Sequence, residues 1–184
     1  MINKAIAFAT KAHGGQRRKG TDIPFILHPM EVGMIVSRMT DDAEVIAAAV
    51  LHDVVEDCQS VSVEQIAEEF GERVAGIVRM ESEDKSKTWK ERKGATLKSL
   101  KEQTMWEAKF VALGDKLSNI RCIHGDYMRI GEKIWERFNV KDKQMQGWYY
   151  RGLCDALSDL SDLEEYQEFS RLVAAVFDGV IAEE

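Results

Sequence analysis

The residues best suited to chemistry stand at the end of a strongly apolar segment, in the stretch His52-Asp53-Val54-Val55-Glu56-Asp57. The preceding stretch, Val45 to Leu51, has no polar residue and predicts a helix that is buried on all sides. Carboxylates at the C-terminal end of a helix are disfavoured by the helix dipole and by one another, and a cation would offset both penalties. The pattern fits either a cation site beside His52 or a group of exposed acids at a fraying helix end.

Asp115 and His28 are two further candidates for the same site. Asp115 shares one helical face with Ala108 and Val111, which predicts a carboxylate in or near the core. A buried carboxylate needs a salt bridge, a set of hydrogen bonds or a metal ion. His28 immediately precedes Pro29, a residue suited to a first helical turn, and taken alone it is more readily a hydrogen-bonded structural histidine.

Together, His28, His52, Asp53 and Asp115 offer two imidazoles and two carboxylates. Such a mixed set suits Mn²⁺, Fe²⁺, Co²⁺, Ni²⁺ or Zn²⁺ better than Ca²⁺ or Mg²⁺, which favour oxygen ligands. Four protein ligands leave positions open for water or a phosphate oxygen if the ion is six-coordinate. A metal of this kind can generate hydroxide near neutral pH and neutralise a phosphate leaving group.

The composition of the chain limits its partners. Its 184 residues, 45% of them hydrophobic, fit one domain over residues 1–184. The net charge of −7 argues against binding long nucleic acid. Basic residues cluster at Arg17-Arg18-Lys19 and between Lys85 and Lys93, where they indicate either a small anionic ligand or a solvated surface. The three cysteines have no paired spacing, which suits a reducing cytoplasm, and no apolar run reaches the roughly 18 residues of a membrane span.

The hydrophobic pattern predicts an all-α fold, a single bundle of eight or more helices. The chain has only two prolines and no alternating β-branched segments of useful length. Asp41 or Asp42 is expected to cap the central helix, and Ser62 with Gln65 matches a capping box. The expected helices cover about residues 2–12, 29–39, 42–57, 62–70, 72–80, 89–103, 105–123, 127–138, 142–160 and 162–181.

The order of these residues resembles the His…His-Asp…Asp signature of the HD phosphohydrolase superfamily. The surrounding motifs are similar to those of the hydrolase domain in RelA/SpoT-type alarmone enzymes and their stand-alone relatives. The match covers about residues 5–123 and leaves 124–184 as a helical C-terminal extension. Its motifs are His13 with Gln16-Arg17-Arg18-Lys19-Gly20, Pro24-Phe25-Ile26-Leu27-His28-Pro29, Ala48 to Asp57 followed by Phe70-Gly71, and Gly114-Asp115-Lys116-Leu117-Ser118-Asn119-Ile120-Arg121.

By this resemblance the four candidate ligands bind one divalent ion, with Mn²⁺ expected. Glu56 and Asp57 match the pair that orients or deprotonates the attacking water. Arg18 and Lys19 match positions that stack on the purine and contact phosphate, and Asn119 matches a residue near the nucleotide sugar. The implied chemistry is removal of the 3′-pyrophosphate from guanosine tetra- or pentaphosphate. Further candidates for contacts with substrate phosphates are Arg17, Lys85, Arg92 and Lys93.

The sequence also departs from the family pattern. Gly114 stands where Ala is usual, and Phe25 stands where Tyr is common. No family motif is recognised beyond Tyr127, and the aromatic residues Trp148 to Tyr150 are expected to pack between helices.

Two other functions stay open. The first is an HD phosphohydrolase acting on another nucleotide, such as a dinucleotide cofactor phosphate or a deoxynucleotide. The second is a nucleotide-binding sensor that has lost catalysis. Retention of Glu56 and Asp57 beside all four candidate ligands argues against the sensor, because a protein that only binds has no use for a water-activating pair.

Overall fold

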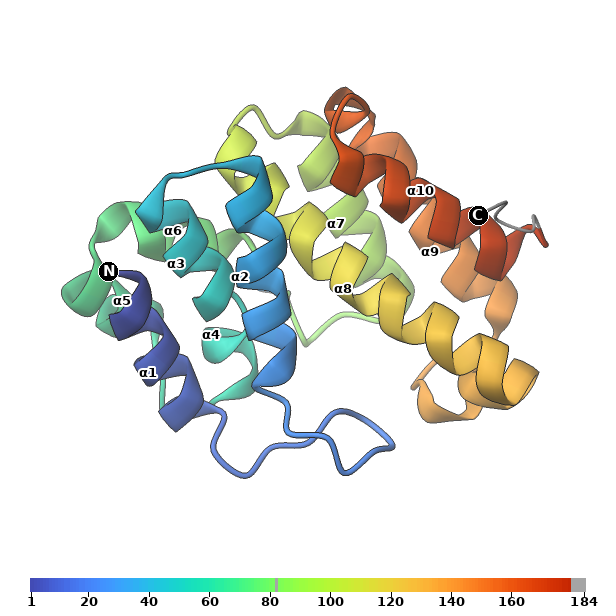
Figure 1. Ribbon diagram of the computed structural model, residues 1–184, viewed down its shortest axis with the longest axis horizontal. Helices are drawn as coiled ribbons and strands as arrows, with labels where there is room; N and C mark the ends of the chain where they lie inside the picture. Colours follow the sequence, from blue (N-terminus) through green and yellow to red (C-terminus); the bar gives the residue numbers. More distant parts are fainter. Residues whose placement is uncertain (82, 180–184) are drawn as a thin grey trace. The chain divides into compact units, whose positions relative to one another are not determined.

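The computed structural model describes residues 1–81 and 83–179, and over these residues it is built from helices (Figure 1). Its only β-type pairing in this part of the chain is an isolated bridge between Arg17 and Pro24. The all-α prediction is confirmed. The chain divides into two compact units, Met1–Glu83 with Met105–Asp115, and Asp84–Thr104 with Lys116–Glu184. The expectation of a single domain over 1–184 stays a prediction.

The first unit contains the helices that carry the four candidate ligands. Its helices are α1 (Ile2–Ala12), α2 (Leu27–Met39), α3 (Ala43–Leu51), α4 (Val54–Asp57), α5 (Val63–Phe70), α6 (Glu72–Met80) and the beginning of α8 (Trp106–Ile130). Every residue from Val45 to Leu51 is buried, and α3 packs against α1, α2 and α6. A helix that is apolar all round is stable only in such a central position.

Two caps fix the ends of helices in the first unit. The Asp42 side chain accepts a hydrogen bond from the main-chain N–H of Glu44 at 2.9 Å, which caps α3. The Ser62 side chain accepts from the main-chain N–H of Gln65 at 3.3 Å, which caps α5. Both satisfy N–H groups that have no partner inside the helix, as the sequence predicts.

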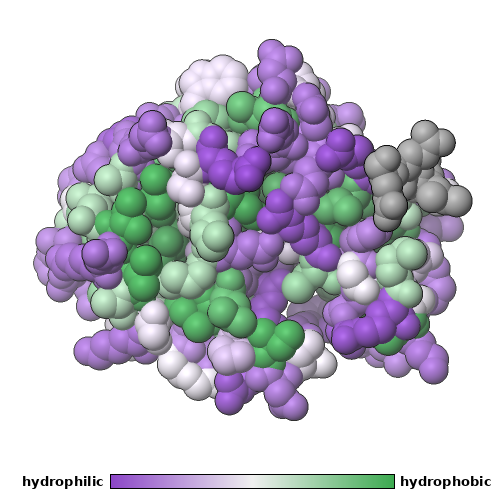
Figure 2. All heavy atoms as spheres, viewed as in Figure 1, coloured by the Kyte–Doolittle hydropathy of each residue, from purple (hydrophilic) through white to green (hydrophobic). Residues whose placement is uncertain are grey.

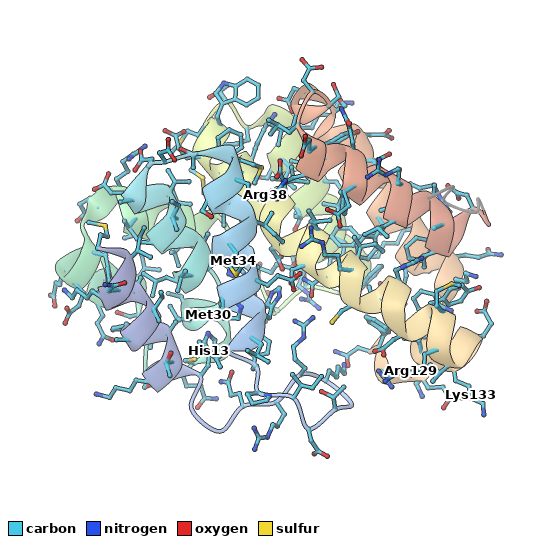
Figure 3. All side chains as sticks on the ribbon, in the orientation of Figure 1. His13, Met30, Met34, Arg38, Arg129 and Lys133 are labelled. Carbon is cyan, nitrogen blue, oxygen red and sulfur yellow. The ribbon has the colours of Figure 1, made fainter. Side chains whose placement is uncertain are left out.

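Close packing of α2 on α3 depends on Gly33. A Cβ atom at this position would lie 2.6 Å from the Cγ2 atom of Val50, well inside van der Waals contact. The outer face of α2 is exposed, and Met34 on it is 71% exposed. Figure 2 shows apolar side chains over this helix, and Figure 3 labels Met30, Met34 and Arg38 along it.

The second unit consists of α7 (Trp89–Glu102), the rest of α8, the 3-10 helix η1 (Gly131–Arg137), α9 (Lys143–Ala156), the 3-10 helix η2 (Ser158–Leu160) and α10 (Glu164–Phe177). Helix α9 packs against α7 and α10. Tyr149 and Tyr150 are buried within this unit, whereas Trp148 is 37% exposed. The two tyrosines therefore pack within the unit, as the sequence predicts. Arg121 on α8 forms a two-point ion pair with Glu168 on α10, at 2.7 and 2.6 Å.

Several predicted boundaries are wrong, and the first is that of the central helix. The central helix was expected to reach Asp57, but α3 ends at Leu51 and the separate turn α4 begins at Val54. The Nδ1 atom of His52 lies 2.8 Å from the main-chain oxygen of Ala49, the oxygen that a continuing helix would offer to the N–H of Asp53. This competition interrupts the helix at the candidate site.

Two further errors lie at the ends of α2 and α8. The helices expected over 142–160 and 162–181 end at Ala156 and Phe177, and positions 180 and 181 of the second lie outside the described residues. Helix α2 begins at Leu27, so His28 lies inside its first turn and does not precede it. Helix α8 continues to Ile130, and η1 begins directly after it at Gly131, which has a φ of 61°. The helix expected over 127–138 is therefore the end of α8 followed by a 3-10 turn, because glycine readily adopts the left-handed conformation that ends a helix.

In the part of the chain that the structure describes, none of the helices combines the length and the apolar character needed to cross a membrane.

Candidate metal centre

The side chains of His28, His52, Asp53 and Asp115 converge within the first unit. The Nε2 atom of His28 lies 3.1 Å from Oδ1 of Asp115 and 3.5 Å from Oδ2 of Asp53. The Nε2 atom of His52 lies 3.1 Å from Oδ2 of Asp53 and 3.7 Å from Oδ1 of Asp115. The sequence predicts this set as metal ligands, and the structure brings it together from α2, the α3–α4 turn and α8.

Among the four candidate ligands, Asp53 has the most exposed side chain. The side chains of His28, His52 and Asp115 are 2%, 1% and 8% exposed, whereas that of Asp53 is 21% exposed. Solvent and a small ligand therefore have access from the side of Asp53. The other three donors are held against the protein interior, where an unpaired carboxylate or a charged imidazole is costly.

The hydrogen bond from His52 to the backbone determines which of its ring nitrogens is available. Its Nδ1 atom faces the oxygen of Ala49, an acceptor, so Nδ1 carries the proton and donates it. In the neutral ring, Nε2 is then an unprotonated acceptor that faces the carboxylates of Asp53 and Asp115. Nε2 is buried and has no hydrogen-bond partner among the described residues. Nε2 of His52 and the carboxylates of Asp53 and Asp115 are then three electron-pair donors that face one another, and a divalent ion bound between them would remove their mutual repulsion.

The pKa values of His52 and Asp53, but not that of His28, indicate that the cluster stabilises a positive charge. Burial by itself lowers the pKa of His52, but the carboxylates of Asp53 and Asp115 outweigh it and hold this pKa well above the usual value. For His28, burial dominates and lowers the pKa despite the contact with Asp115. Burial raises the pKa of Asp53, but His52 outweighs burial and the net pKa lies below the usual value.

The distances fit a divalent ion of the first transition series. Ligand atoms at about 2.1 Å from a common ion are roughly 3.0 to 3.4 Å apart in octahedral or tetrahedral geometry. The imidazole–carboxylate distances of 3.1 to 3.7 Å overlap this range, and the two longest exceed it by 0.1 to 0.3 Å. His28, His52 and Asp53 each place a ligand atom within 4.8 Å of the others. The donors are nitrogen and oxygen in equal number, so the residues fit the ion that their types predict.

Gly114 allows α8 to bring Asp115 to His28. A Cβ atom at position 114 would lie 2.9 Å from Cγ2 of Val36 and 3.3 Å from Cγ1 of Val32, both on α2. The glycine thus permits a close approach of the two helices next to the site. This close packing of α8 on α2 places the carboxylate of Asp115 beside the imidazole of His28.

Glu56 and Asp57, the predicted water-activating pair, lie on α4 directly after Asp53. Glu56 is half-buried and Asp57 is exposed. Because the helix is interrupted between Leu51 and Val54, His52 and Glu56 do not lie on one continuous helix. Asp57 does keep a helical main-chain bond to Asp53, N–H to oxygen at 2.9 Å. This hydrogen bond connects the pair to Asp53, one of the candidate ligands, through the short turn.

The basic run Arg17-Arg18-Lys19 lies in the loop between α1 and α2. This loop folds back on itself, because the N–H of Arg18 donates to the oxygen of Ile23 and that of Phe25 to the oxygen of Gln16. Its end is near the cluster, since the ring of Phe25 lies 5.7 Å from that of His28. The contacts of the three basic side chains with a substrate stay a prediction.

Four other predicted substrate contacts belong to the second unit. Asn119 lies on α8, and Arg92 and Lys93 lie on α7. The Nζ atom of Lys93 is 4.9 Å from the centre of the Tyr149 ring in the same unit, a cation–π distance. Lys85 lies in the turn before α7. For these residues a role in binding the substrate stays a prediction.

A hydrogen-bond network that the sequence did not predict connects His13, Gln16 and Cys58 beside the cluster. Gln16 contacts both His13 and the main-chain oxygen of Asp57, which is 41 residues away in sequence. The side chain of His13 is almost fully buried. His13 and Gln16 do stand in one of the motifs that carry the family resemblance, which is the only signal in the sequence that marks them.

Comparison with known proteins identifies the family. The HD domain family matches residues 5–140. The chain is 38% identical over 145 residues to guanosine-3′,5′-bis(diphosphate) 3′-pyrophosphohydrolase MESH1 of Danio rerio, covering 77% of each protein. It is 34% identical over 124 residues to a guanosine-3′,5′-bis(diphosphate) 3′-pyrophosphohydrolase of Aquifex aeolicus, covering 66% of this chain but only 18% of that protein.

A solved structure agrees with these matches. It is described as a metazoan ortholog of SpoT that hydrolyses ppGpp, and it superposes with a TM-score of 0.78 at 26% identity, covering 95% of this chain and 94% of that one. The family, the order of the four candidate ligands and the helical architecture agree with one another. The chain belongs to the HD domain family.

Proposed function

We propose that this protein is a metal-dependent phosphohydrolase that removes the 3′-pyrophosphate of guanosine 3′,5′-bis(diphosphate) or of the corresponding pentaphosphate. The products are pyrophosphate and GDP or GTP. The observation that carries the proposal is the convergence of His28, His52, Asp53 and Asp115 in a chain that matches a stand-alone hydrolase of this activity over 77% of its length.

The ion that we propose is Mn²⁺, held by these four residues. When bound, it would polarise the phosphate ester and lower the pKa of a water molecule. The mixed nitrogen and oxygen donors support a transition metal over Mg²⁺ or Ca²⁺. His52 is oriented for metal binding by its backbone contact. Its Nδ1–H donates a hydrogen bond to the oxygen of Ala49, so Nε2 is the nitrogen available to the ion.

Glu56 and Asp57 handle the proton of the attacking water. They follow Asp53 on α4, and the accessible side of the cluster is the side of Asp53. A carboxylate at that opening accepts a proton while the buried ligands stay deprotonated. Positioned acid–base groups of this kind typically contribute about 10² to 10⁴ in rate.

The basic residues bind the substrate. Arg17, Arg18 and Lys19 hold its phosphates and base, because planar guanidinium groups serve both stacking and two-point anion contacts. Asn119 contacts the sugar, and Lys85, Arg92 and Lys93 supply further phosphate contacts. These roles rest on the family resemblance and on residue chemistry.

The proposed setting is the cytoplasm, with a small nucleotide as the partner. Three cysteines without paired spacing suit a reducing compartment, and the net charge of −7 disfavours long nucleic acid and anionic membrane surfaces.

A panel of nucleotides assayed with Mn²⁺ tests the substrate. Guanosine tetraphosphate is compared with a deoxynucleoside triphosphate and a phosphorylated dinucleotide cofactor, and products are separated by anion exchange. The proposal predicts preferential turnover of guanosine tetraphosphate with release of pyrophosphate. Faster turnover of another nucleotide would assign the site to a different substrate, and tight binding of guanosine tetraphosphate without hydrolysis would indicate a sensor.

A further inference from the structure

Helix α4 is too short to be stable on its own. It spans only Val54–Asp57, and a single turn fixes several dihedral angles for very few hydrogen bonds. Its main-chain oxygens at the C-terminal end have no partner within the helix. Since α4 carries Glu56 and Asp57, the position of the proposed proton acceptors depends on what holds this turn.

Gln16 holds the end of α4. Its Nε2 atom donates to the main-chain oxygen of Asp57 at 3.1 Å and lies 3.7 Å from the sulfur of Cys58. The main-chain oxygen of Gln16 accepts from the N–H of Phe25 at 3.0 Å, which closes the base of the basic loop. One residue therefore joins the α4 turn to the loop that contains Arg17, Arg18 and Lys19.

His13 orients Gln16. Because the Nε2 of Gln16 donates to a carbonyl, the Oε1 of Gln16 must be the atom that faces Nδ1 of His13, at 2.8 Å. Oε1 can only accept, so Nδ1 of His13 carries the proton and donates it. The ring of His13 also contacts that of Phe25, with centroids 4.9 Å apart, and Figure 3 labels His13 beside the start of α2.

Cys58 completes the network at the other side of His13. Its sulfur lies 3.3 Å from the main-chain oxygen of Ala12 and 3.5 Å from Nδ1 of His13. Burial raises the pKa of Cys58, so the thiol is neutral and donates to Ala12. His13 and Cys58 are buried and Gln16 is half-buried. The bond from His13 to Gln16 is therefore partly shielded from competition with water, whereas the bond from Gln16 to the oxygen of Asp57 lies at the surface.

We propose that His13 and Gln16 are positioning residues, which hold the Glu56–Asp57 turn and the basic loop in one arrangement over the metal cluster. They act through two hydrogen bonds in series. Nδ1–H of His13 donates to Oε1 of Gln16, and Nε2–H of Gln16 donates to the main-chain oxygen of Asp57. This inference rests on the proposed function for its effect on turnover. The anchoring itself is a property of the fold and can be measured without a substrate.

Two conservative replacements of His13 separate this role from simple core packing. The amide nitrogen of asparagine can take the place of Nδ1, whereas that of glutamine takes the place of Nε2. With Mn²⁺ and guanosine tetraphosphate, His13→Ala, His13→Gln and Gln16→Ala are expected to lower kcat by about 10- to 100-fold, as small misplacements of catalytic groups do. His13→Asn is expected to recover kcat to within about threefold of wild type. Gln167→Ala, which removes a comparable side-chain bond to a main-chain oxygen at 3.2 Å, is the matched control.

A double-mutant cycle with Asp57→Asn tests whether His13 acts through the α4 turn. If it does, His13→Ala lowers kcat by less than about twofold in the Asp57→Asn background, because the two changes affect the same step. Metal content should remain that of wild type in all variants. Equal activity of His13→Asn and His13→Gln, or an additive loss in the double mutant, would overturn the proposal.

Hydrogen exchange distinguishes failure of this inference from failure of the proposed function. Faster exchange of the amides in 14–25 and 56–59 is expected for His13→Ala and Gln16→Ala, and wild-type rates for His13→Asn. If the wild type does not hydrolyse guanosine tetraphosphate, the proposed function fails while this exchange pattern still supports the anchoring. Unchanged exchange in both alanine variants would refute the anchoring whatever the activity.

Discussion

At the scale of single residues, Asp115 is the ligand whose removal is most informative. It is 8% exposed at the side chain and its Oδ1 is 3.1 Å from His28. Asp115→Ala is expected to lose bound Mn²⁺ and metal-dependent turnover while the helical fold persists, since the remaining imidazoles can be neutral. Metal analysis and circular dichroism of the purified variant measure both. The control is Asp41→Ala, an exposed acid of the same unit. A metal content in Asp115→Ala equal to that of wild type would remove Asp115 from the ligand set.

Glu56 and Asp57 should behave differently from the ligands. Glu56→Gln and Asp57→Asn are expected to keep the metal and the affinity for substrate but to lose about 10²- to 10⁴-fold in kcat, because they remove a proton acceptor and leave the ion in place. Turnover and metal content are measured on the same samples. Near-normal kcat in both variants would leave water activation to the metal alone.

At the scale of helices, the packing of α2 on α3 makes Gly33 sensitive to the smallest change. Gly33→Ala gains about 1 kcal/mol of helix propensity but forces a methyl group toward Val50, where its Cβ would lie at 2.6 Å. Overpacking of this kind costs about 1 to 3 kcal/mol, so the free energy of unfolding is expected to fall.

Gly76 provides the matched control for this prediction. It lies inside α6, and a Cβ there would have no heavy atom within 4 Å, so Gly76→Ala is expected to raise stability by about 0.5 to 1 kcal/mol. Urea unfolding of both variants measures the difference. If Gly33→Ala were stabilised as much as Gly76→Ala, the close approach of α2 and α3 would be contradicted.

Arg73 joins three helices of the first unit through ion pairs with Asp42, Glu44 and Glu107 at 2.7, 2.7 and 2.9 Å. The hydrogen bond from Arg73 lowers the pKa of Asp42 in the folded state. The resulting stability is therefore present above the unfolded pKa of about 3.9 and is lost as the pH falls through the lower folded value. Because these groups are about a third exposed, the network contributes at most about 1 kcal/mol.

Thermal unfolding of wild type and Arg73→Met across pH measures this contribution. The wild type is expected to be the more stable near pH 7, and the difference in Tm should shrink below about pH 4. The metal ligands titrate in both proteins and cancel in the difference. A gap that stays constant or widens in acid would show that Asp42 is not stabilised by Arg73.

Helix positions were largely predictable, and the errors have local causes. The apolar run Val45 to Leu51 requires a central helix, and Asp42 and Ser62 cap their helices as expected. The interruption at His52 was not predictable from periodicity, because it depends on the side-chain bond from His52 to Ala49. Similarly, α8 ends where Gly131 adopts a left-handed conformation, and the sequence does not show which glycine in a helical pattern will do so.

At the scale of the whole molecule, the all-α class and the convergence of the four candidate ligands were predictable from residue types and their order along the chain. The close approaches at Gly33 and Gly114, and the bond from Gln16 to Asp57, were not. These features join residues that are distant in sequence, and no local pattern specifies which side chains meet. The departure from the family pattern at Gly114 is visible in the sequence. That a Cβ at this position would collide with side chains of α2 can be seen only in the structure.

Metal occupancy and product release, measured together, test the central claim most directly. Metal-free protein is titrated with Mn²⁺ in the presence of guanosine 3′,5′-bis(diphosphate), and bound metal and released pyrophosphate are recorded at each point. If hydrolysis requires one ion bound at the cluster, we expect no turnover without metal and a rate that rises in proportion to occupancy until one ion is bound per chain. The expected products are pyrophosphate and GDP. Full turnover without metal, or release of orthophosphate in place of pyrophosphate, would contradict it.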